Sequence, residues 1–222
     1  MLNRFTGAVA GAILLLAPAA FAQGNAAPGN AAPGNTWTIA PLDSSANFTV
    51  KHLLISTEHG GMGGMKGTVI YDPKDPSKDS VEATLDVSTI NTNNPTRDEK
   101  LKTEYFVVKQ FPLIIFKSTK VFKAGTGRLR MIGSLTIKGT TKQVVVEVQG
   151  PTPAVKDAQG RQKIALTATA KVSRKDFGIV GDALDSALET GGIIVSDEVS
   201  IELDIELMLP GQAGIVGPAK PK

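Results

Sequence analysis

Apolar and polar residues alternate with a period of two over much of this chain. In residues 46–52, Ala46, Phe48, Val50 and His52 share one face, and polar residues occupy the positions between them. The same alternation returns at residues 81–88, 129–137, 164–173 and 199–209. A strand with one face in apolar surroundings and the other in water has this pattern. The pattern therefore predicts an antiparallel, all-β protein.

Turn-forming sequences separate these segments. Residues 72–76 contain two prolines, and residues 123–127 and 138–140 are glycine-containing and short enough for hairpins. Many consecutive strands joined in this way are typical of a sandwich or a barrel. A barrel leaves no long edge exposed, which matters for a strand as long as residues 199–209.

Residues 96–119 predict a helix, a turn and a buried strand. Thr96 and Glu99 have the spacing of a capping box, and apolar residues then recur at helical spacing as far as Val108. Pro112 suits the first position of a strand because it supplies no hydrogen-bond donor. The apolar run at residues 113–116 is expected to be buried.

Several positions on the apolar faces carry small residues, namely Ala46, Ala83, Gly133, Ala168 and Ala170. Small residues on the inner face of a barrel leave room for a ligand. They can equally seat the helix predicted at residues 96–108 against the sheet. The residues alone leave both interpretations open.

Six groups of residues along the chain resemble the motifs of the YceI-like family. The longest is Arg97–Asp98 followed by Leu101, Phe106, Phe111–Pro112, Ile114, Phe116 and Ser118. The others are Trp37 with Asp43 and Ser45; Phe48, Val50 and His52; Gly133 with Leu135–Thr140; Arg174 with Asp176–Gly178; and Asp197–Val199 with Ile201. The resemblance implies a lipocalin-like antiparallel β-barrel of about eight strands with one or two short helices.

Some members of that family hold a polyisoprenoid chain inside the barrel, so the resemblance favours a ligand cavity. We expect an exported lipid-binding protein that holds a polyisoprenoid or an isoprenoid quinone for transport, storage or a stress response. No cofactor is expected other than this lipid, and the resemblance implies that a homodimer can form. By parity, the predicted lining residues are Phe48, Val50, Leu85, Phe116, Leu129, Met131, Leu166 and Leu203.

Three polar residues are candidates for contact with a ligand headgroup. His52 continues the apolar face of its strand, so it either meets a headgroup at the cavity mouth or caps the strand through a backbone carbonyl. Arg97 and Arg174 can fork onto phosphate or quinone oxygens, because a guanidinium presents paired donors. They can equally hold a buried carboxylate such as Asp98 or Asp176.

A metal site is the alternative function. His59, Met62 and Met65 lie close together in the sequence, and thioethers select Cu(I). A periplasmic copper-handling protein would use such a loop. The other interpretation is a flexible, glycine-rich loop at the barrel rim whose methionines cover apolar surface.

Neither catalysis nor nucleic-acid binding is expected. The chain has two histidines, no cysteine and no G-x-S-x-G turn, and the acidic residues Glu202, Asp204 and Glu206 share the polar face of the last strand. The net charge of +3 falls to +2 when residues 1–22 are removed, since Arg4 is the charged residue among them. No basic stripe with interleaved aromatic residues is present.

The two ends of the chain differ in composition from the middle. Residues 1–22 have the pattern of a secretory signal peptide: Arg4, an apolar segment too short to span a membrane, and Ala20–Phe21–Ala22 before the expected cut. We therefore expect a periplasmic mature protein without a transmembrane segment. Residues 23–36 are predicted to be a Gly/Asn/Ala/Pro linker, residues 37–209 the barrel, and residues 210–222 a disordered tail.

Overall fold

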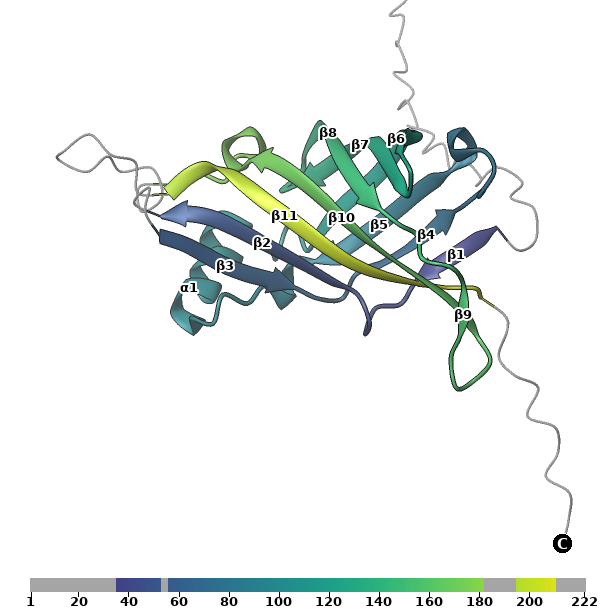
Figure 1. Ribbon diagram of the computed structural model, residues 1–222. Helices are drawn as coiled ribbons and strands as arrows, with labels where there is room; N and C mark the ends of the chain where they lie inside the picture. Colours follow the sequence, from purple (N-terminus) through teal and green to yellow (C-terminus); the bar gives the residue numbers. More distant parts are fainter. Residues whose placement is uncertain (1–34, 53–55, 182–194, 211–222) are drawn as a thin grey trace, which may run out of the picture. The chain divides into compact units, whose positions relative to one another are not determined.

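The computed structural model describes residues 35–52, 56–181 and 195–210. Its strands form one antiparallel sheet (Figure 1). The strands are β1 (Thr36–Ile39), β2 (Ser45–His52), β3 (Ser56–Met62), β4 (Lys66–Ile70), β5 (Ser80–Asp86), β6 (Leu113–Gly125), β7 (Arg128–Ile137), β8 (Thr140–Gln149), β9 (Val155–Lys156), β10 (Gln162–Ser173) and β11 (Val195–Met208).

The sheet closes into a barrel. Eight strands follow one another in the order β11-β1-β4-β5-β6-β7-β8-β10, and β10 pairs with β11 to complete the ring. β2 continues beside β11 beyond the end of β1, and β3 pairs with β2. The predicted lipocalin-like β-barrel is confirmed.

The inner faces of the strands carry the predicted apolar residues. On β7, Met131, Gly133, Leu135 and Ile137 are buried, whereas the residues that alternate with them are more exposed. The β7–β8 hairpin turns through Lys138 and Gly139, whose φ angles are 49° and 74°. Two successive positive φ angles make the type I′ turn that matches strand twist, which explains the short connection.

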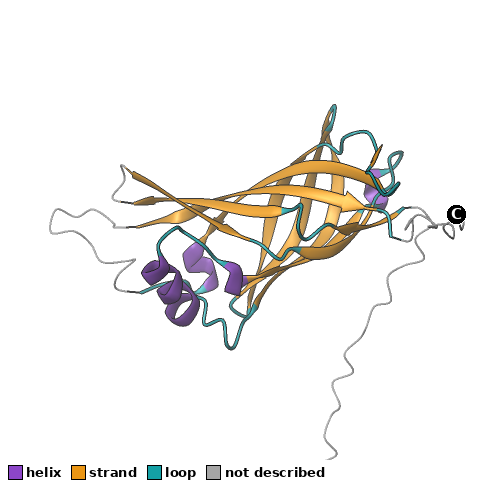
Figure 2. Cartoon of the chain, turned by 90° about the horizontal axis from the view of Figure 1, so that it is seen from below, coloured by secondary structure: helices purple, strands orange, loops and turns teal. Residues whose placement is uncertain are grey.

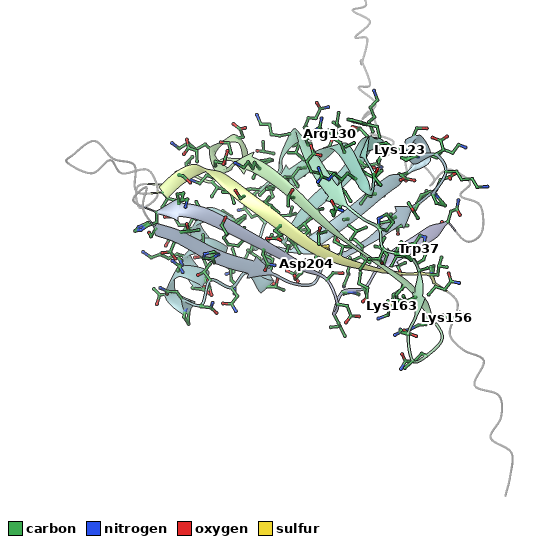
Figure 3. All side chains as sticks on the ribbon, in the orientation of Figure 1. Trp37, Lys123, Arg130, Lys156, Lys163 and Asp204 are labelled. Atoms are coloured by element: carbon green, nitrogen blue, oxygen red, sulfur yellow. The ribbon has the colours of Figure 1, made fainter. Side chains whose placement is uncertain are left out.

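The outer faces of the strands carry charged residues (Figure 3). Arg130 pairs with Glu147 across β7 and β8, and Lys163 pairs with Glu206 across β10 and β11. Glu202 and Asp204 are exposed on β11. The predicted acidic face of the last strand therefore lies outside the barrel.

The prediction that residues 113–116 form a buried run is wrong. Leu113 and Ile115 are 42% and 44% exposed, whereas Phe116 lies against two buried clusters of the barrel interior. In a closed barrel each strand has one outward face, so consecutive apolar residues are divided between inside and outside.

A helical segment joins β5 to β6. It consists of η2 (Val87–Thr89), α1 (Pro95–Lys100) and η3 (Leu101–Tyr105), which is a π-helical turn. The predicted capping box is wrong, because the cap is Asn94, whose side chain accepts a hydrogen bond from the Arg97 N–H at 3.1 Å. Asparagine is a strong cap, and the proline that follows it suits the first helical position.

The two ends of the barrel are built differently. One end carries the last residue of β2 (His52), the segment from η2 to η3, the β7–β8 hairpin and η4 (Arg174–Phe177), and it is called the mouth end. The far end carries the β6–β7 hairpin and the β4–β5 connection, which includes η1 (Pro76–Lys78). Most helical segments accordingly gather at one end of the strands (Figure 2).

The predicted signal peptide and nearly all of the predicted linker and tail lie outside the described residues. Thr36, which the linker prediction included, already belongs to β1, where it pairs with Ile70. Among the residues that the structure describes, no helix is long and apolar enough to span a membrane.

Candidate ligand cavity

A cavity of about 530 Å³ lies at the mouth end and is called the mouth cavity. The inner faces of β2, β3 and β11 form part of its wall, and the segment from α1 to η3 forms another part. Most of its wall is apolar. Its polar side chains include His52, Glu58, Thr92, Asn94, Thr96, Arg97, Lys100 and Arg174.

A second cavity of about 200 Å³ lies deeper in the barrel and is called the deep cavity. Its wall is made almost entirely of aliphatic and aromatic side chains, many from the buried cluster around Val121, Met131 and Val148. Tyr71 and Asp79 belong to its wall near the far end. Five residues line both cavities, so the two meet inside the barrel: Ala46, Leu85, Ile114, Ile137 and Ile201.

All eight lining residues predicted by parity border one of these cavities. Phe48 and Val50 line the mouth cavity, and Leu85 lines both. The remaining five line the deep cavity: Phe116, Leu129, Met131, Leu166 and Leu203. Their contact with a ligand stays a prediction.

The small inner residues mostly leave space rather than seat the helix. Ala46, Ala83, Ala168 and Ala170 line the deep cavity. The helical segment packs elsewhere, where Leu101, Tyr105 and Phe106 join a cluster around Leu135, Ile137 and Phe177. Gly133 is different, because a Cβ there would overlap the ring of Phe116. The ring of Phe116 therefore occupies the space where a side chain at position 133 would lie.

Gly60 has a similar role that the sequence analysis did not identify. It lies opposite Phe48 across β2 and β3, and a Cβ at Gly60 would overlap the Phe48 ring. Glycine here leaves room for the tip of the ring against the neighbouring strand, in the wall of the mouth cavity. The spacing of large and small residues within one strand gives no sign of this cross-strand pair.

Arg97 joins α1 to β3 at the mouth cavity. Its NH1 group donates to Glu58 Oε2 at 2.7 Å, Nε donates to Thr92 Oγ1 at 2.7 Å, and NH2 donates to the Thr92 carbonyl at 2.9 Å. Thr92 also donates through its backbone N–H and its hydroxyl to Asp98 Oδ1. Arg97 thus pairs with Glu58 and not with Asp98, which the sequence analysis offered as a partner.

Arg174, just after the end of β10, connects this part of the chain to the beginning of β11 through hydrogen bonds. It is 4% exposed and, in the described part of the chain, donates to the carbonyls of Ile179, Val195 and Ser196 and to Asp197 Oδ1, at 2.8–3.2 Å. The predicted partner Asp176 is not among these acceptors. Arg174 also lines the mouth cavity, so it combines a structural role with a position near a ligand.

His52 ends β2 at the mouth cavity and is half-buried. Its Nδ1 lies 3.5 Å from Ser56 Oγ, and the same hydroxyl donates to the His52 carbonyl at 2.9 Å. The backbone of the strand end is therefore capped by Ser56. The imidazole is left at the cavity wall, and its contact with a headgroup stays a prediction.

The residues of the metal alternative do not converge. His59 opposes Thr49 and is exposed, whereas Met62 opposes Ala46 on the inner face, so these two side chains leave the sheet in opposite directions. His59 and Met62 both contribute to the wall of the mouth cavity, whereas Met65 lines the deep cavity, and the two methionines are buried. Of the predicted rim loop, residues 60–62 belong to β3 instead, and residues 63–65 connect β3 to β4.

Asp79 supplies a carboxyl group to the wall of the deep cavity. Its Oδ1 accepts a hydrogen bond from the Asp72 N–H at 2.7 Å. Burial, together with the nearby charges of Asp72 and Asp75, raises the pKa of Asp79 from 3.8 to about 6. Burial and the neighbouring Asp79 likewise raise the pKa of Tyr71. The surroundings of Asp79 and Tyr71 in the wall of the deep cavity therefore favour their neutral forms.

Comparison with known proteins gives matches over this barrel. The family model described as the YceI-like domain matches residues 37–207. The protein YceI of Salmonella newport is 35% identical over 157 residues, which cover 68% of this chain and 78% of that protein. YceI of Salmonella arizonae matches to the same extent.

Solved structures share the fold. BcnA of Burkholderia cenocepacia aligns with a TM-score of 0.63 and 21% identity, over 76% of this chain and 98% of BcnA. YceI of Campylobacter jejuni aligns with a TM-score of 0.57 and 25% identity, over 71% of this chain and 88% of that one. A polyisoprenoid binding domain from Saccharophagus degradans aligns with a TM-score of 0.57 and 12% identity, over 78% of this chain and 98% of that domain.

Proposed function

Because this chain belongs to the YceI-like family, we propose that it binds a polyisoprenoid or an isoprenoid quinone inside the barrel. The observation that carries the proposal is the pair of cavities that meet within one apolar wall. The polyisoprenoid binding domain of Saccharophagus degradans has the same fold, which supports this choice of lipid.

The distribution of polar groups determines how the lipid lies. Charged and polar side chains line the mouth cavity, whereas the deep cavity is almost entirely apolar. An amphiphile therefore binds with its tail toward the far end and its headgroup near His52 and Lys100, which both line the mouth cavity. Arg97 and Arg174 stabilise the cavity wall near the headgroup, because their guanidinium groups donate to acceptors of the protein itself.

Tail burial supplies the affinity. Each buried methylene contributes about 0.8 kcal/mol before the cost of ordering the chain, so a long tail is held without a strong polar contact. Such binding needs no covalent step and no metal. The lipid can leave the cavity unchanged, as transport, storage and stress protection all require.

We place this lipid binding in the periplasm, and the signal-peptide pattern of residues 1–22 supports that location.

Mass spectrometry of the lipid that co-purifies with the protein from its own periplasm tests the proposal. The expected result is an isoprenoid species in near-stoichiometric amount in an organic extract of the folded protein. A variant with a filled deep cavity, Ala168→Phe, purified in parallel should retain less of it, since Ala168 lines that cavity. Extracts that contain only membrane phospholipid at the level of a control periplasmic protein would contradict the proposal.

A further inference from the structure

Inward-facing residues along a strand pass from the deep cavity to the mouth cavity in a fixed order. On β11, Ile205 and Leu203 line only the deep cavity, whereas Val199 lines only the mouth cavity. Ile201, which lies between them, lines both. The change from one cavity to the other thus occurs at a single inward position of the strand.

On two other strands, the inward residue nearest the mouth end is the one that lines both cavities. On β5, Ala83 lines the deep cavity and Leu85 lines both; on β7, Leu135 lines the deep cavity and Ile137 lines both. Ala46 on β2 and Ile114 on β6 complete the set. These five shared residues are called the waist, and they come from five different strands: Ala46, Leu85, Ile114, Ile137 and Ile201.

The waist is wholly aliphatic, so a hydrocarbon crosses it without losing a hydrogen bond. Four of its residues are leucine or isoleucine, and Ala46 is the small one. Ala46 is 5% exposed and belongs to the core cluster near Trp37 and Ile39. A larger side chain at position 46 would extend into the passage between the cavities.

From this arrangement we propose that the waist sets the chain-length preference of the protein. A short isoprenoid fills only the mouth cavity, whereas a longer one crosses the waist and gains additional affinity from the deep cavity. This inference rests on the proposed function, because it specifies which isoprenoids the same cavity selects. Since a buried methylene is worth about fourfold in affinity, one five-carbon unit in the deep cavity gives about tenfold or more after ordering costs.

The test is a titration with all-trans geraniol, farnesol and geranylgeraniol, which share a hydroxyl headgroup and differ in chain length. The wild-type protein is compared with Ala46→Leu, which blocks the waist. Ala165→Leu is the matched control, because Ala165 is exposed on the outer face of β10. Thermal unfolding of each variant confirms that its barrel is folded.

We expect the affinity of the wild-type protein and of Ala165→Leu to rise at least about tenfold from the shortest to the longest alcohol. In Ala46→Leu this rise should disappear, while geraniol binds within about threefold of wild type, because its chain stays in the mouth cavity. Leu85→Phe tests the same passage from another strand, so the result does not depend on one variant being folded.

Two outcomes separate the inference from the proposed function. If wild type binds the alcohols and folded Ala46→Leu and Leu85→Phe keep its chain-length dependence, the waist is not the determinant and the inference alone is overturned. If the wild-type protein binds none of the three alcohols and carries no isoprenoid from its own periplasm, the proposed function is overturned and the inference with it.

Discussion

His52 is the polar residue best placed to distinguish a headgroup from a plain hydrocarbon. Its imidazole lies in the wall of the mouth cavity, and the adjacent strand end is capped by Ser56 rather than by the imidazole. We expect His52→Leu to weaken binding of a head-bearing isoprenoid by about 1 kcal/mol, the net value of one hydrogen bond, and to leave a bare isoprenoid hydrocarbon unaffected. Parallel titrations with the two ligands check this, and equal losses would indicate a structural role.

Arg174 is expected to matter for stability more than any arginine on the outer face. Because it is buried and donates to three carbonyls and to Asp197, Arg174→Met should lower the free energy of unfolding by about 3 kcal/mol. Arg130→Met is the control, since its pair with Glu147 is half exposed and contributes less than about 1 kcal/mol. Urea denaturation measures both, and similar losses for the two variants would contradict the assignment.

Asp79 is expected to make the free energy of unfolding decrease as the pH rises. Its pKa is raised on folding from 3.8 to about 6, so the protonated form is favoured in the native state and ionisation destabilises the fold as the pH rises from 4 to 6. The full shift corresponds to about 3 kcal/mol, which half-exposure reduces to about 1 kcal/mol. Asp79→Asn should therefore stabilise the protein by about 1 kcal/mol at pH 7 and have no effect near pH 4.

The control for this prediction lies in the same connection. Hydrogen bonds from Ser77 to the Asp75 carboxylate lower the pKa of Asp75, so its charge is favoured by folding. Asp75→Asn should give no stabilisation at pH 7. A stability profile of Asp79→Asn that runs parallel to wild type between pH 4 and 7 would show that burial does not act on this carboxyl group.

At the level of elements, the strands could be predicted because their signal is local. Alternation within a few residues identifies the inner face of β2, β7 and β10, and parity alone assigns the lining residues. Local patterns failed where two of them compete. The Thr96–Glu99 spacing and the Asn94–Pro95 pair both indicate a helix start, and Asn94 caps the helix because proline fits directly after it.

Pairs between elements could not be predicted in this way. Arg97 and Glu58 are 39 residues apart and meet only because α1 lies beside β3. Gly60 and Phe48 meet only because of the β2–β3 register. Alternation along a strand likewise identifies which residues face inward but not their position along the barrel axis. The five waist residues therefore could not be predicted from the sequence.

Filling the deep cavity from two strands tests whether its volume is used. Ala83 lies on β5 and Ala168 on β10, and both line this cavity. We expect Ala83→Phe and Ala168→Phe each to weaken binding of a long isoprenoid at least about tenfold, because a ring occupies the space that the tail needs. Titration with geranylgeraniol measures the effect, and near-ultraviolet circular dichroism verifies tertiary packing. Normal binding by both folded variants would show that the tail lies elsewhere.

For the whole molecule, the barrel encloses both cavities within the part of the chain that the structure describes. Both cavities are bounded by residues between Ile39 and Leu207, which nearly coincide with the family match at residues 37–207. The charged outer face meets water, whereas the apolar interior favours groups that water does not solvate.

Export is the remaining prediction for the molecule as a whole. The N-terminal pattern predicts cleavage before Gln23. It consists of Arg4, the apolar segment that follows it and Ala20–Phe21–Ala22, and a cleavable signal peptide carries small residues three positions and one position before the cut. We expect N-terminal sequencing of protein from the periplasmic fraction to begin at or near Gln23. An Ala20→Arg, Ala22→Arg double variant should keep the uncleaved, heavier chain at the membrane, because the cleavage site no longer fits. Periplasmic protein that retains Met1 would contradict cleavage at this site.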